Sequence, residues 1–472
     1  MLFHEPLFLF VFFPAFYALY LLFGRKEMLR LVLLTTGSIL FYFWGEPRFV
    51  PLVILSSLLD YVIAQRLSRD PSSHAGKALL AFGIACNVAL LIVYKYLGFL
   101  VSNLDAGLRA IDLPAVAVPS IALPIGVSFI VFEKITYLVD VARGQSPPAK
   151  SITHYLTYVF FFPKLLAGPI IKYHEIEAKF RRLGHVHAED VISGMLRFML
   201  GLVKKTLVAD TVSGVADQIF ALPNTQIGFA NAWLGIVLFT LQIYFDFSSY
   251  SDMAIGLARM LGFSLKENFD MPYISCSITE FWRRWHISLS SWIREYLYIP
   301  LGGSRVGPAR HYFNLWFCFL VSGLWHGAAW TYVIWGAYNG VFLVLDKLVL
   351  LRVLGRMPAV LANAITMLVV MVGWTAFRAT SLPQLSAFLA AMTHPGRQGA
   401  GVFLPGNVTA ALAAGLFVCI APRLPGYHQV SEWVRGTGWS RFALETGMAL
   451  LFLLAVSVAT TDPFKPFLYF RF

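Results

Sequence analysis

Apolar runs of about 20 residues recur along this chain from Leu7 to Thr460, separated by short charged turns. A helix of about 20 residues crosses the roughly 30 Å of hydrocarbon in a bilayer, and its backbone satisfies its own hydrogen bonds there. The ten-residue alternation of β-barrel strands is not seen. The sequence therefore predicts an all-α, polytopic membrane protein with about 11 to 13 transmembrane helices plus re-entrant and interfacial helices.

The composition supports this class. Hydrophobic residues make up 58% of the 472 residues and charged residues only 13%, whereas a soluble domain has about 25% charged residues. The net charge is +12, but Lys and Arg lie in short loops, where they orient helices and meet anionic membrane lipid. We therefore expect no nucleic-acid partner.

Basic residues also predict the orientation. They gather in the 24–30 and 66–77 loops, which the positive-inside rule places in the cytoplasm, so the N-terminus is expected on the extracytoplasmic side. The run from 7 to 23 is predicted to be a retained span, because no basic segment precedes it and no small-residue cleavage site follows it. The aromatic and basic tail, 463–472, is predicted to be an interfacial anchor.

No internal repeat or soluble domain is evident, so residues 1–472 are expected to form a single membrane domain. We divide it into N-terminal spans (1–120), a core that carries the motifs (121–350) and C-terminal spans (351–472).

Two segments of the core are unusual for lipid-facing helices. The run 121–141 carries Glu133, Lys134 and Asp140, which favours an interior position, because charges are costly in hydrocarbon. The stretch 162–169 holds two prolines and a glycine, which predicts a broken or re-entrant segment covered by protein.

A histidine lies in a tryptophan-rich stretch at 281–296. At 100° per residue this stretch predicts one amphipathic helix, with apolar rings on one face and Arg283, His286, Ser290 and Arg294 on the other. His286 is a candidate for chemistry on that polar face. The alternative is an interfacial residue on a solvated helix.

The second histidine, His326, lies in an apolar run of about 40 residues, twice what a bilayer requires. The chain must turn or break inside this run, and Gly323 and Gly327 place the break at the histidine. An ionisable ring in such surroundings predicts a functional site, because an unpaired polar group is costly there. The alternative is a core histidine bonded to a backbone carbonyl. Trp325, beside it, is a candidate substrate contact.

The residues near the two histidines limit the possible chemistry. No GxSxG elbow, HExxH motif or neighbouring cysteine is present, so neither a covalent acyl-enzyme nor a metal site is predicted. Direct transfer between two bound substrates, with histidine as the general base, fits better. Asp246 and Asp252 lie at a predicted polar interruption between apolar stretches. They are expected to cap helices or pair with an arginine, and Asp246 is also a candidate substrate contact.

Five motifs resemble, in content and order, those of the membrane-bound O-acyltransferase family. The ends of the chain, 2–10 and 467–472, are similar to those of its alginate O-acetylation subgroup. The five motifs are Phe162–Ile170, Phe245–Gly256, Asn268–Tyr273, Phe281–Ser290 and Leu324–Gly327.

This resemblance implies helices around a thinned centre, with a funnel from each side meeting at two histidines. His326 matches the family's proposed catalytic histidine and His286 its second. The implied activity is inner-membrane O-acetylation of an exported polysaccharide, with acetyl-CoA as the cytoplasmic donor, no permanently bound cofactor and separate periplasmic acetyltransferase partners. Arg283 and Arg294 would attract the anionic donor, and Ser290, Asp246 and Trp325 would be further substrate contacts.

Other functions remain open at this point. One alternative is an acyltransferase of the same family that acts on another envelope polymer, such as peptidoglycan or cellulose. A transporter would line its path with the same broken helices, although the lack of an internal repeat argues against it. A scaffold would use both histidines structurally.

Overall fold

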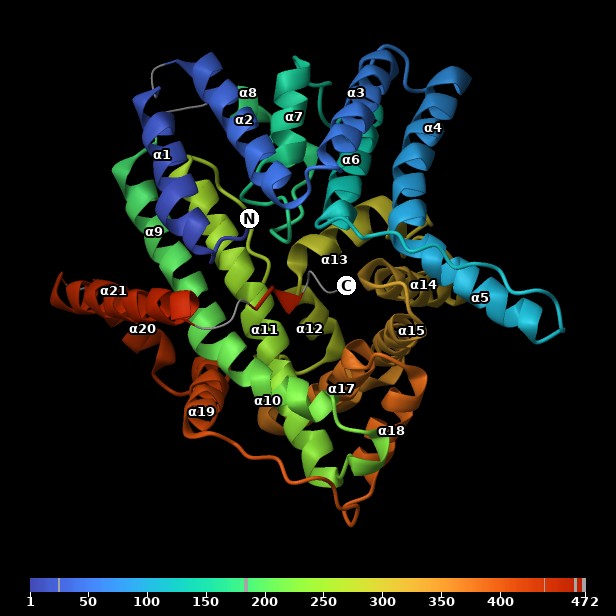
Figure 1. The fold of residues 1–472 in the computed structure, drawn as a ribbon, viewed down its shortest axis with the longest axis vertical. Helices are drawn as coiled ribbons and strands as arrows, with labels where there is room; N and C mark the ends of the chain where they lie inside the picture. The colour runs from blue at the N-terminus through green and yellow to red at the C-terminus, as the bar shows by residue number, and fades with distance from the viewer. Residues whose placement is uncertain (24–25, 182–185, 437, 462–464, 469–472) are drawn as a thin grey trace. The chain divides into compact units, whose positions relative to one another are not determined.

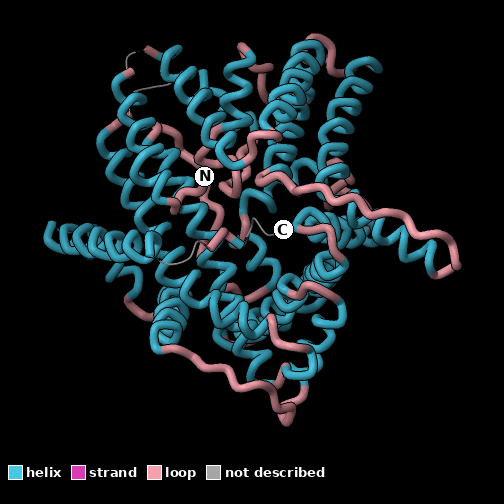
Figure 2. Tube along the Cα trace, viewed as in Figure 1, coloured by secondary structure: helices cyan, strands magenta, loops and turns pink. Residues whose placement is uncertain are grey.

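The computed structural model describes residues 1–23, 26–181, 186–436, 438–461 and 465–468. Every regular element in these ranges is a helix (Figure 2), which confirms the predicted all-α class. Gly24 and Arg25, part of a basic turn used to predict orientation, and most of the 463–472 tail lie outside the described residues.

The helices group into two compact units. Unit 1 comprises 1–195 and 254–266, and unit 2 comprises 196–253 and 267–472. The helices α9 (Ala188–Val203) and α11 (Phe229–Met260) contribute residues to both. A single membrane domain over 1–472 stays a prediction.

Unit 1 contains the first eight α-helices of the chain, α1 to α8, which are labelled in Figure 1. They are α1 (Phe13–Leu22), α2 (Glu27–Gly45), α3 (Val50–Leu67), α4 (His74–Leu91), α5 (Leu97–Arg109), α6 (Val127–Ala142), α7 (Ile152–Phe160) and α8 (Tyr173–Arg181).

Unit 2 contains the remaining helices. They are α10 (Asp210–Phe220), α12 (Ile278–Arg284), α13 (Ile287–Ile293), α14 (Pro308–His326), α15 (Trp330–Leu345), α16 (Leu351–Leu354), α17 (Ala359–Arg378), α18 (Leu382–Thr393), α19 (Gly406–Ile420), α20 (Tyr427–Gly436) and α21 (Gly438–Thr461). Wider π-helical turns extend several helices, at Phe8–Phe12, Ile92–Tyr96, Lys204–Ala209, Arg294–Tyr298 and Asp346–Leu350.

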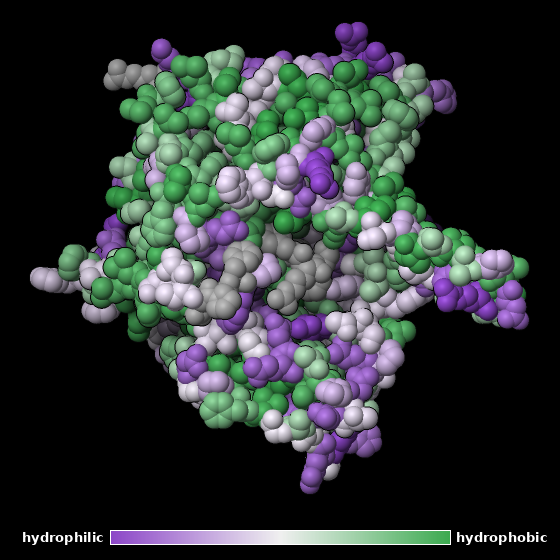
Figure 3. Space-filling view, in the orientation of Figure 1, coloured by the Kyte–Doolittle hydropathy of each residue, from purple (hydrophilic) through white to green (hydrophobic). Residues whose placement is uncertain are grey.

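Eight helical stretches in the described part of the chain are long and apolar enough to cross a membrane. They are Glu27–Gly45, Val50–Leu67, His74–Arg109, Phe229–Met260, Trp330–Leu354, Ala359–Arg378, Gly406–Arg423 and Gly438–Thr461. In Figure 3, hydrophobic side chains cover α1 to α4, as expected for a lipid-facing surface. The protein is thus a multi-pass membrane protein.

Eight is fewer than the predicted 11 to 13, and the difference lies in short or polar helices. The run 121–141, predicted to be an interior helix, contains the 16-residue helix α6. The helix α9 continues through the π-helical turn Lys204–Ala209 into α10 and carries Arg197, Lys204 and Lys205 along the way. The helix α14 has 19 residues but carries Pro308, Arg310 and His311 in its first turns. Each of these helices is either shorter than a bilayer requires or carries charged or polar residues.

The interior of unit 1 confirms two predictions. Glu133, Lys134 and Asp140 are each at most 1% exposed, so α6 is interior. The segment after α7 has no regular helix up to Lys172 and is buried, as the prolines and glycine at 162–169 predict.

Phe467 and Leu468, in the last described segment, pack into unit 2. Phe467 and Leu468 are 1% and 4% exposed, and the Leu468 N–H donates to Asp246 Oδ2 over 2.7 Å. The Phe467 ring covers the Lys205 ammonium at 4.4 Å. For these two residues the prediction of an interfacial anchor is wrong, because an internal carboxylate and ammonium hold them.

Candidate active site

His326 is the last residue of α14, and α14 and α15 form the helical hairpin that the long apolar run requires. Gly327, directly after it, is extended, and α15 begins at Trp330. The predicted break at Gly323–Gly327 is therefore confirmed.

Small residues let the two helices of this hairpin approach closely. A methyl group on Gly323 would lie 2.9 Å from the Gly336 Cα, and one on Gly336 would lie 2.6 Å from the Phe319 carbonyl oxygen. Such contacts leave no space for a side chain at either position. The glycines thus fix where the α14 end presents His326.

The second histidine lies at a break that the sequence pattern did not predict. The expected single helix over 281–296 is wrong, because α12 ends at Arg284 and α13 begins at Ile287. His286 lies between them in the left-handed region, with φ 46° and ψ 54°, which a residue with a Cβ seldom adopts. His286 is only 2% exposed, so the alternative of an interfacial residue on a solvated helix is wrong too.

Hydrogen bonds to the stretch before α12 hold this break in place. The Ile287 N–H donates to the Asn268 carbonyl, and the Asp270 N–H donates to the Arg284 carbonyl, each over 2.9 Å. His286 lies in the sequence between Arg284 and Ile287, the two residues that these backbone hydrogen bonds fix. The side-chain oxygen of Asn268 lies 3.1 Å from His286 Nδ1.

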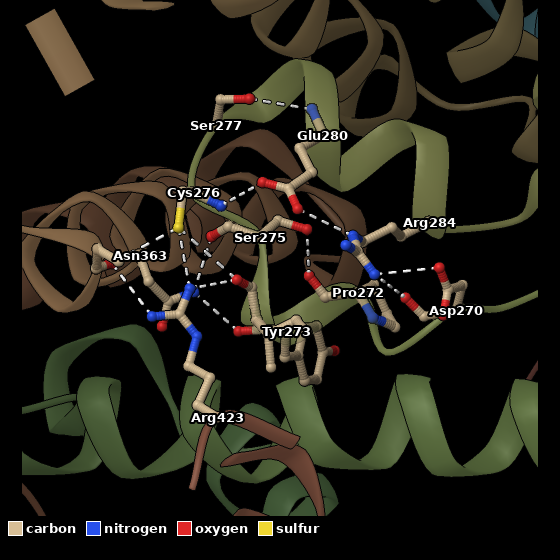
Figure 4. Close-up of polar contacts among 12 residues, drawn as sticks. Asp270, Pro272, Tyr273, Ser275, Cys276, Ser277, Glu280, Arg284, Asn363 and Arg423 are labelled. Carbon is tan, nitrogen blue, oxygen red and sulfur yellow. Dashed lines mark hydrogen bonds and ion pairs between the residues drawn. The ribbon is translucent and has the colours of Figure 1, made fainter. Parts of the chain in front are cut away.

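The start of α12 is anchored by its own side chains (Figure 4). Ser277 Oγ accepts from the Glu280 N–H, and the Glu280 carboxylate accepts from the Cys276 N–H over 2.8 Å. Glu280 also pairs with Arg284, which reaches Asp270 Oδ2 at 3.0 Å. This variant of a capping box fixes both ends of the short helix.

The turn before α12 is held by partners that lie far along the sequence (Figure 4). Asn363 Nδ2 donates to the carbonyls of Tyr273 and Ser275 over 2.9 and 2.7 Å. The Arg423 guanidinium donates to the Ile274 carbonyl and lies 2.9 Å from Cys276 Sγ. The site is therefore built on α17 and on the 3-10 turn Ala421–Arg423 that follows α19, as well as on α12.

The two imidazoles lie close together among aromatic rings. Their centroids are 6.4 Å apart. Trp325 contacts both, at 5.0 Å from His326 and 6.1 Å from His286. Trp335 and Phe377 pack edge-on against His326 at 5.1 and 5.2 Å. Both rings are therefore fixed in a largely apolar environment.

Burial also sets the charge of one ring. His286 lies outside the eight candidate spans, and burial lowers its pKa to about 3. The imidazole is thus neutral at physiological pH.

A cavity of about 220 Å³ opens onto both histidines. Two predicted substrate contacts, Arg283 and Ser290, line it, together with aromatic and aliphatic side chains such as Trp282 and Phe319. Arg283 is exposed whereas His286 and His326 are buried. The cavity therefore leads from a charged rim to two buried rings.

A second, wider cavity of about 430 Å³ adjoins the first, and Ser290, Cys318, Phe319 and Lys347 belong to the walls of both. Arg294, another predicted contact, lines the wider cavity. Arg294 and Lys347 are exposed. Cations thus gather at this entrance.

Asp246 is placed differently from the other predicted residues. It accepts from Lys205 Nζ over 2.8 Å and from the Leu468 N–H. Asp252 pairs with Arg197 and Lys204 at 2.7 and 2.8 Å. The pairing that the sequence favoured is observed. The predicted polar interruption is wrong, because α11 runs through both acids without a break.

Sequence reasoning missed three side chains of this site, namely Asn268, Trp282 and Lys347. Asn268 lies in a quoted motif, but no spacing rule connects it with His286. Trp282 lies in the tryptophan-rich stretch but was assigned to neither face of the predicted helix, and Lys347 lies at the end of a long apolar run. Among the described residues, no group of three or more His, Cys, Asp or Glu side chains is placed to hold a metal ion.

Comparison with known proteins identifies the same family that the five motifs resemble. Residues 130–382 match the family model described as MBOAT, membrane-bound O-acyltransferase family. The chain is 37% identical to a probable alginate O-acetylase AlgI of Pseudomonas putida over the full length of both proteins. It is 42% identical to that of Pseudomonas aeruginosa, over 81% of this chain and 73% of the relative. It is also 32% identical to a peptidoglycan O-acetyltransferase of Helicobacter pylori, over 81% of this chain and 78% of the relative.

Proposed function

This chain belongs to the membrane-bound O-acyltransferase family, and we propose that it is an inner-membrane acetyltransferase that moves acetyl from acetyl-CoA to an exported polysaccharide. One observation carries the proposal: two buried histidines open onto a single cavity whose entrance carries exposed cations. The named activities of the relatives support an acetyl ester as the product.

In the proposed reaction His326 is the general base. The acceptor hydroxyl attacks the thioester carbonyl carbon while its proton passes to the His326 imidazole. The tetrahedral intermediate then collapses, the carbon–sulfur bond breaks, and the thiolate of CoA takes the proton from the imidazolium. A thioester and an alcohol give an ester and a thiol, with no net proton change. Base catalysis of this kind contributes roughly 10² to 10⁴-fold.

The walls of the cavity offer partners for both substrates. His286 is neutral, so one of its ring nitrogens accepts a hydrogen bond from a second hydroxyl of the acceptor, while the attacking hydroxyl gives its only proton to His326. Trp282 lines the same cavity, and among the described residues no acceptor bonds its indole N–H. We assign this N–H to the carbonyl oxygen, where negative charge develops.

The cations at the entrance match the donor. Acetyl-CoA carries several phosphate charges, and a cleft lined by positive charge raises the local concentration of an anion. Arg283, Arg294 and Lys347 would meet these phosphates. In this proposal the entrance faces the cytoplasm, the N-terminus is extracytoplasmic, and separate periplasmic acetyltransferase partners complete delivery to the polymer.

The test uses the purified full-length protein in liposomes with acetyl-CoA labelled in its acetyl group. Alginate oligosaccharides are offered as acceptor, together with the periplasmic fraction of an alginate-producing Pseudomonas strain that lacks its own membrane acetylase. We expect label in a base-labile ester of the saccharide. Protein-free liposomes with the same fraction are the control.

A second candidate acceptor, peptidoglycan, is favoured by the Helicobacter pylori relative. The same assay with muropeptides decides between them. Label in muropeptides alone would replace the polysaccharide acceptor. Absence of thioester cleavage with either acceptor, or counterflow of intact acetyl-CoA, would overturn the proposal.

A further inference from the structure

Asn268 lies after α11 and is fully buried, with no exposed surface. Its side chain connects three parts of unit 2: α11, the break between α12 and α13, and the first turn of α13. A buried amide must find partners for its oxygen and its nitrogen. Which partners it finds determines what it does to His286.

The amide oxygen serves three donors. It accepts from the Ser288 N–H over 3.2 Å and the Ser288 hydroxyl over 2.9 Å, and it lies 3.1 Å from His286 Nδ1. The amide nitrogen donates to Ser251 Oγ over 3.2 Å. The amide is thus held from both ends.

These contacts decide how the amide and the imidazole are protonated. A backbone N–H can only donate, so the atom facing Ser288 N must be the oxygen of Asn268 and not its nitrogen. Since an amide oxygen can only accept, Nδ1 of His286 must carry the hydrogen. In the neutral ring, Nε2 is then the nitrogen with the lone pair.

The same contacts hold an unusual backbone. His286 has φ 46°, a conformation that persists only where the surroundings determine it. The Asn268 carbonyl bonds the Ile287 N–H directly after it, and the Asn268 side chain bonds Ser288. One residue therefore fixes the backbone, the ring direction and the tautomer together.

We propose that Asn268 is the positioning residue for His286, and that it keeps Nε2 of this ring as an acceptor toward the substrate in the cavity. This inference rests on the proposed acetyl transfer. Asn268 itself does not line the cavity walls described above, so it acts through His286. Its removal should therefore change turnover more than binding of the donor.

The test compares three full-length variants in the liposome assay. For Asn268→Ala we expect kcat to fall roughly 10- to 100-fold, the scale on which outer partners of a functional histidine matter. The KM for acetyl-CoA should stay close to that of the wild type. The matched control is Asn231→Ala. Asn231 is another buried asparagine of unit 2, its Nδ2 donates to the Ala400 carbonyl over 2.9 Å, and it lines neither cavity. It should retain wild-type turnover per folded molecule.

Asn268→Asp keeps an oxygen for Nδ1–H and adds a negative charge. The carboxylate favours the imidazolium and raises the pKa of His286, so turnover should fall at low pH and recover as pH rises. The other ionisable groups on the walls of the cavity around this ring are His326, Arg283, Cys318 and Lys347, and all four are unchanged in the variant. In a plot of turnover against pH, the acid limb, where turnover falls, should thus lie at higher pH than in the wild type.

The outcomes separate the two proposals. Absence of acetyl transfer by the wild type would overturn the proposed function. With an active wild type, unchanged kcat in Asn268→Ala would overturn the positioning role. If Asn268→Ala fails to fold, Asn268→Asp decides, and an acid limb identical to that of the wild type would overturn the role.

Discussion

Both units bury ionisable side chains, but they do so in opposite ways. In unit 1, Lys134 pairs with Asp60 at 3.2 Å and Lys164 pairs with Glu133, with all four side chains at most 2% exposed. In unit 2, His286 and His326 are also buried, at 2% and 6% exposed, but they open onto a cavity. Burial alone therefore does not mark chemistry in a membrane protein, because a charge that is paired within the protein serves the fold.

The same difference appears within unit 2. Asp246 and Asp252 pair with Lys205, Lys204 and Arg197, and they resemble the charges of unit 1 in this respect. The histidines instead share walls with Arg283 and Ser290. In this protein, a buried ionisable side chain is a candidate for function when it lines a cavity, and it is structural when it is paired within the protein.

The largest expected effect comes from breaking a pair in unit 1. Lys134→Met leaves Asp60 buried without its cation, which costs about 3–5 kcal/mol. We expect a large loss of folded protein in the membrane and normal turnover for the molecules that remain. The measurement is the amount of folded protein by thermal unfolding, alongside transfer per molecule.

Arg109→Met is the control for that variant, because Arg109 pairs with Asp105 at 2.9 Å on an exposed surface. It should cost at most about 1 kcal/mol. Lower turnover per folded molecule in Lys134→Met would break the contrast between the units, since it would give the paired charges a part in the chemistry.

A smaller effect is expected at the hairpin that presents His326. In Gly336→Ala the new methyl group would lie 2.6 Å from the Phe319 carbonyl oxygen, and such overpacking costs about 1–3 kcal/mol. Thermal unfolding should occur at lower temperature, and turnover should fall because the ring moves. Gly447→Ala in α21, where nothing lies within 4 Å, should leave both unchanged. Equal unfolding temperatures for the two variants would contradict the close approach.

The smallest effect is expected at the cavity entrance. Arg294→Ala removes one exposed cation, worth about 1 kcal/mol or less, so the KM for acetyl-CoA should rise roughly fivefold at most. The rise should shrink at high salt, because exposed charges are screened. Arg352→Ala, on exposed α16, should leave KM unchanged. A change in kcat without a change in KM would place Arg294 in the chemistry instead.

The sequence predicted those features that depend on the energetic cost of a single residue type in a regular, lipid-facing helix. Gly323 and Gly327 located the break at His326, charges on 121–141 located an interior helix, and prolines at 162–169 located an irregular segment. In each case the residue type itself excludes a regular, lipid-facing helix.

Other features depend on partners that are distant in sequence, and these were not predicted. The break at His286 is held by Asn268, so helical periodicity over 281–296 gave one helix where there are two. The continuity of α11 depends on cations of α9 and the following π-helical turn, which neutralise Asp252 and Asp246. Periodicity cannot report such contacts, because they follow from the tertiary structure.

The most direct test of the account is single-turnover acetyl transfer by purified His326→Ala at the same concentration of folded protein as the wild type. Because base catalysis contributes roughly 10² to 10⁴-fold, the account predicts a loss of that size with acetyl-CoA binding unchanged. Transfer at a rate within a few-fold of the wild type would show that this imidazole does not take the proton, and would contradict the central claim.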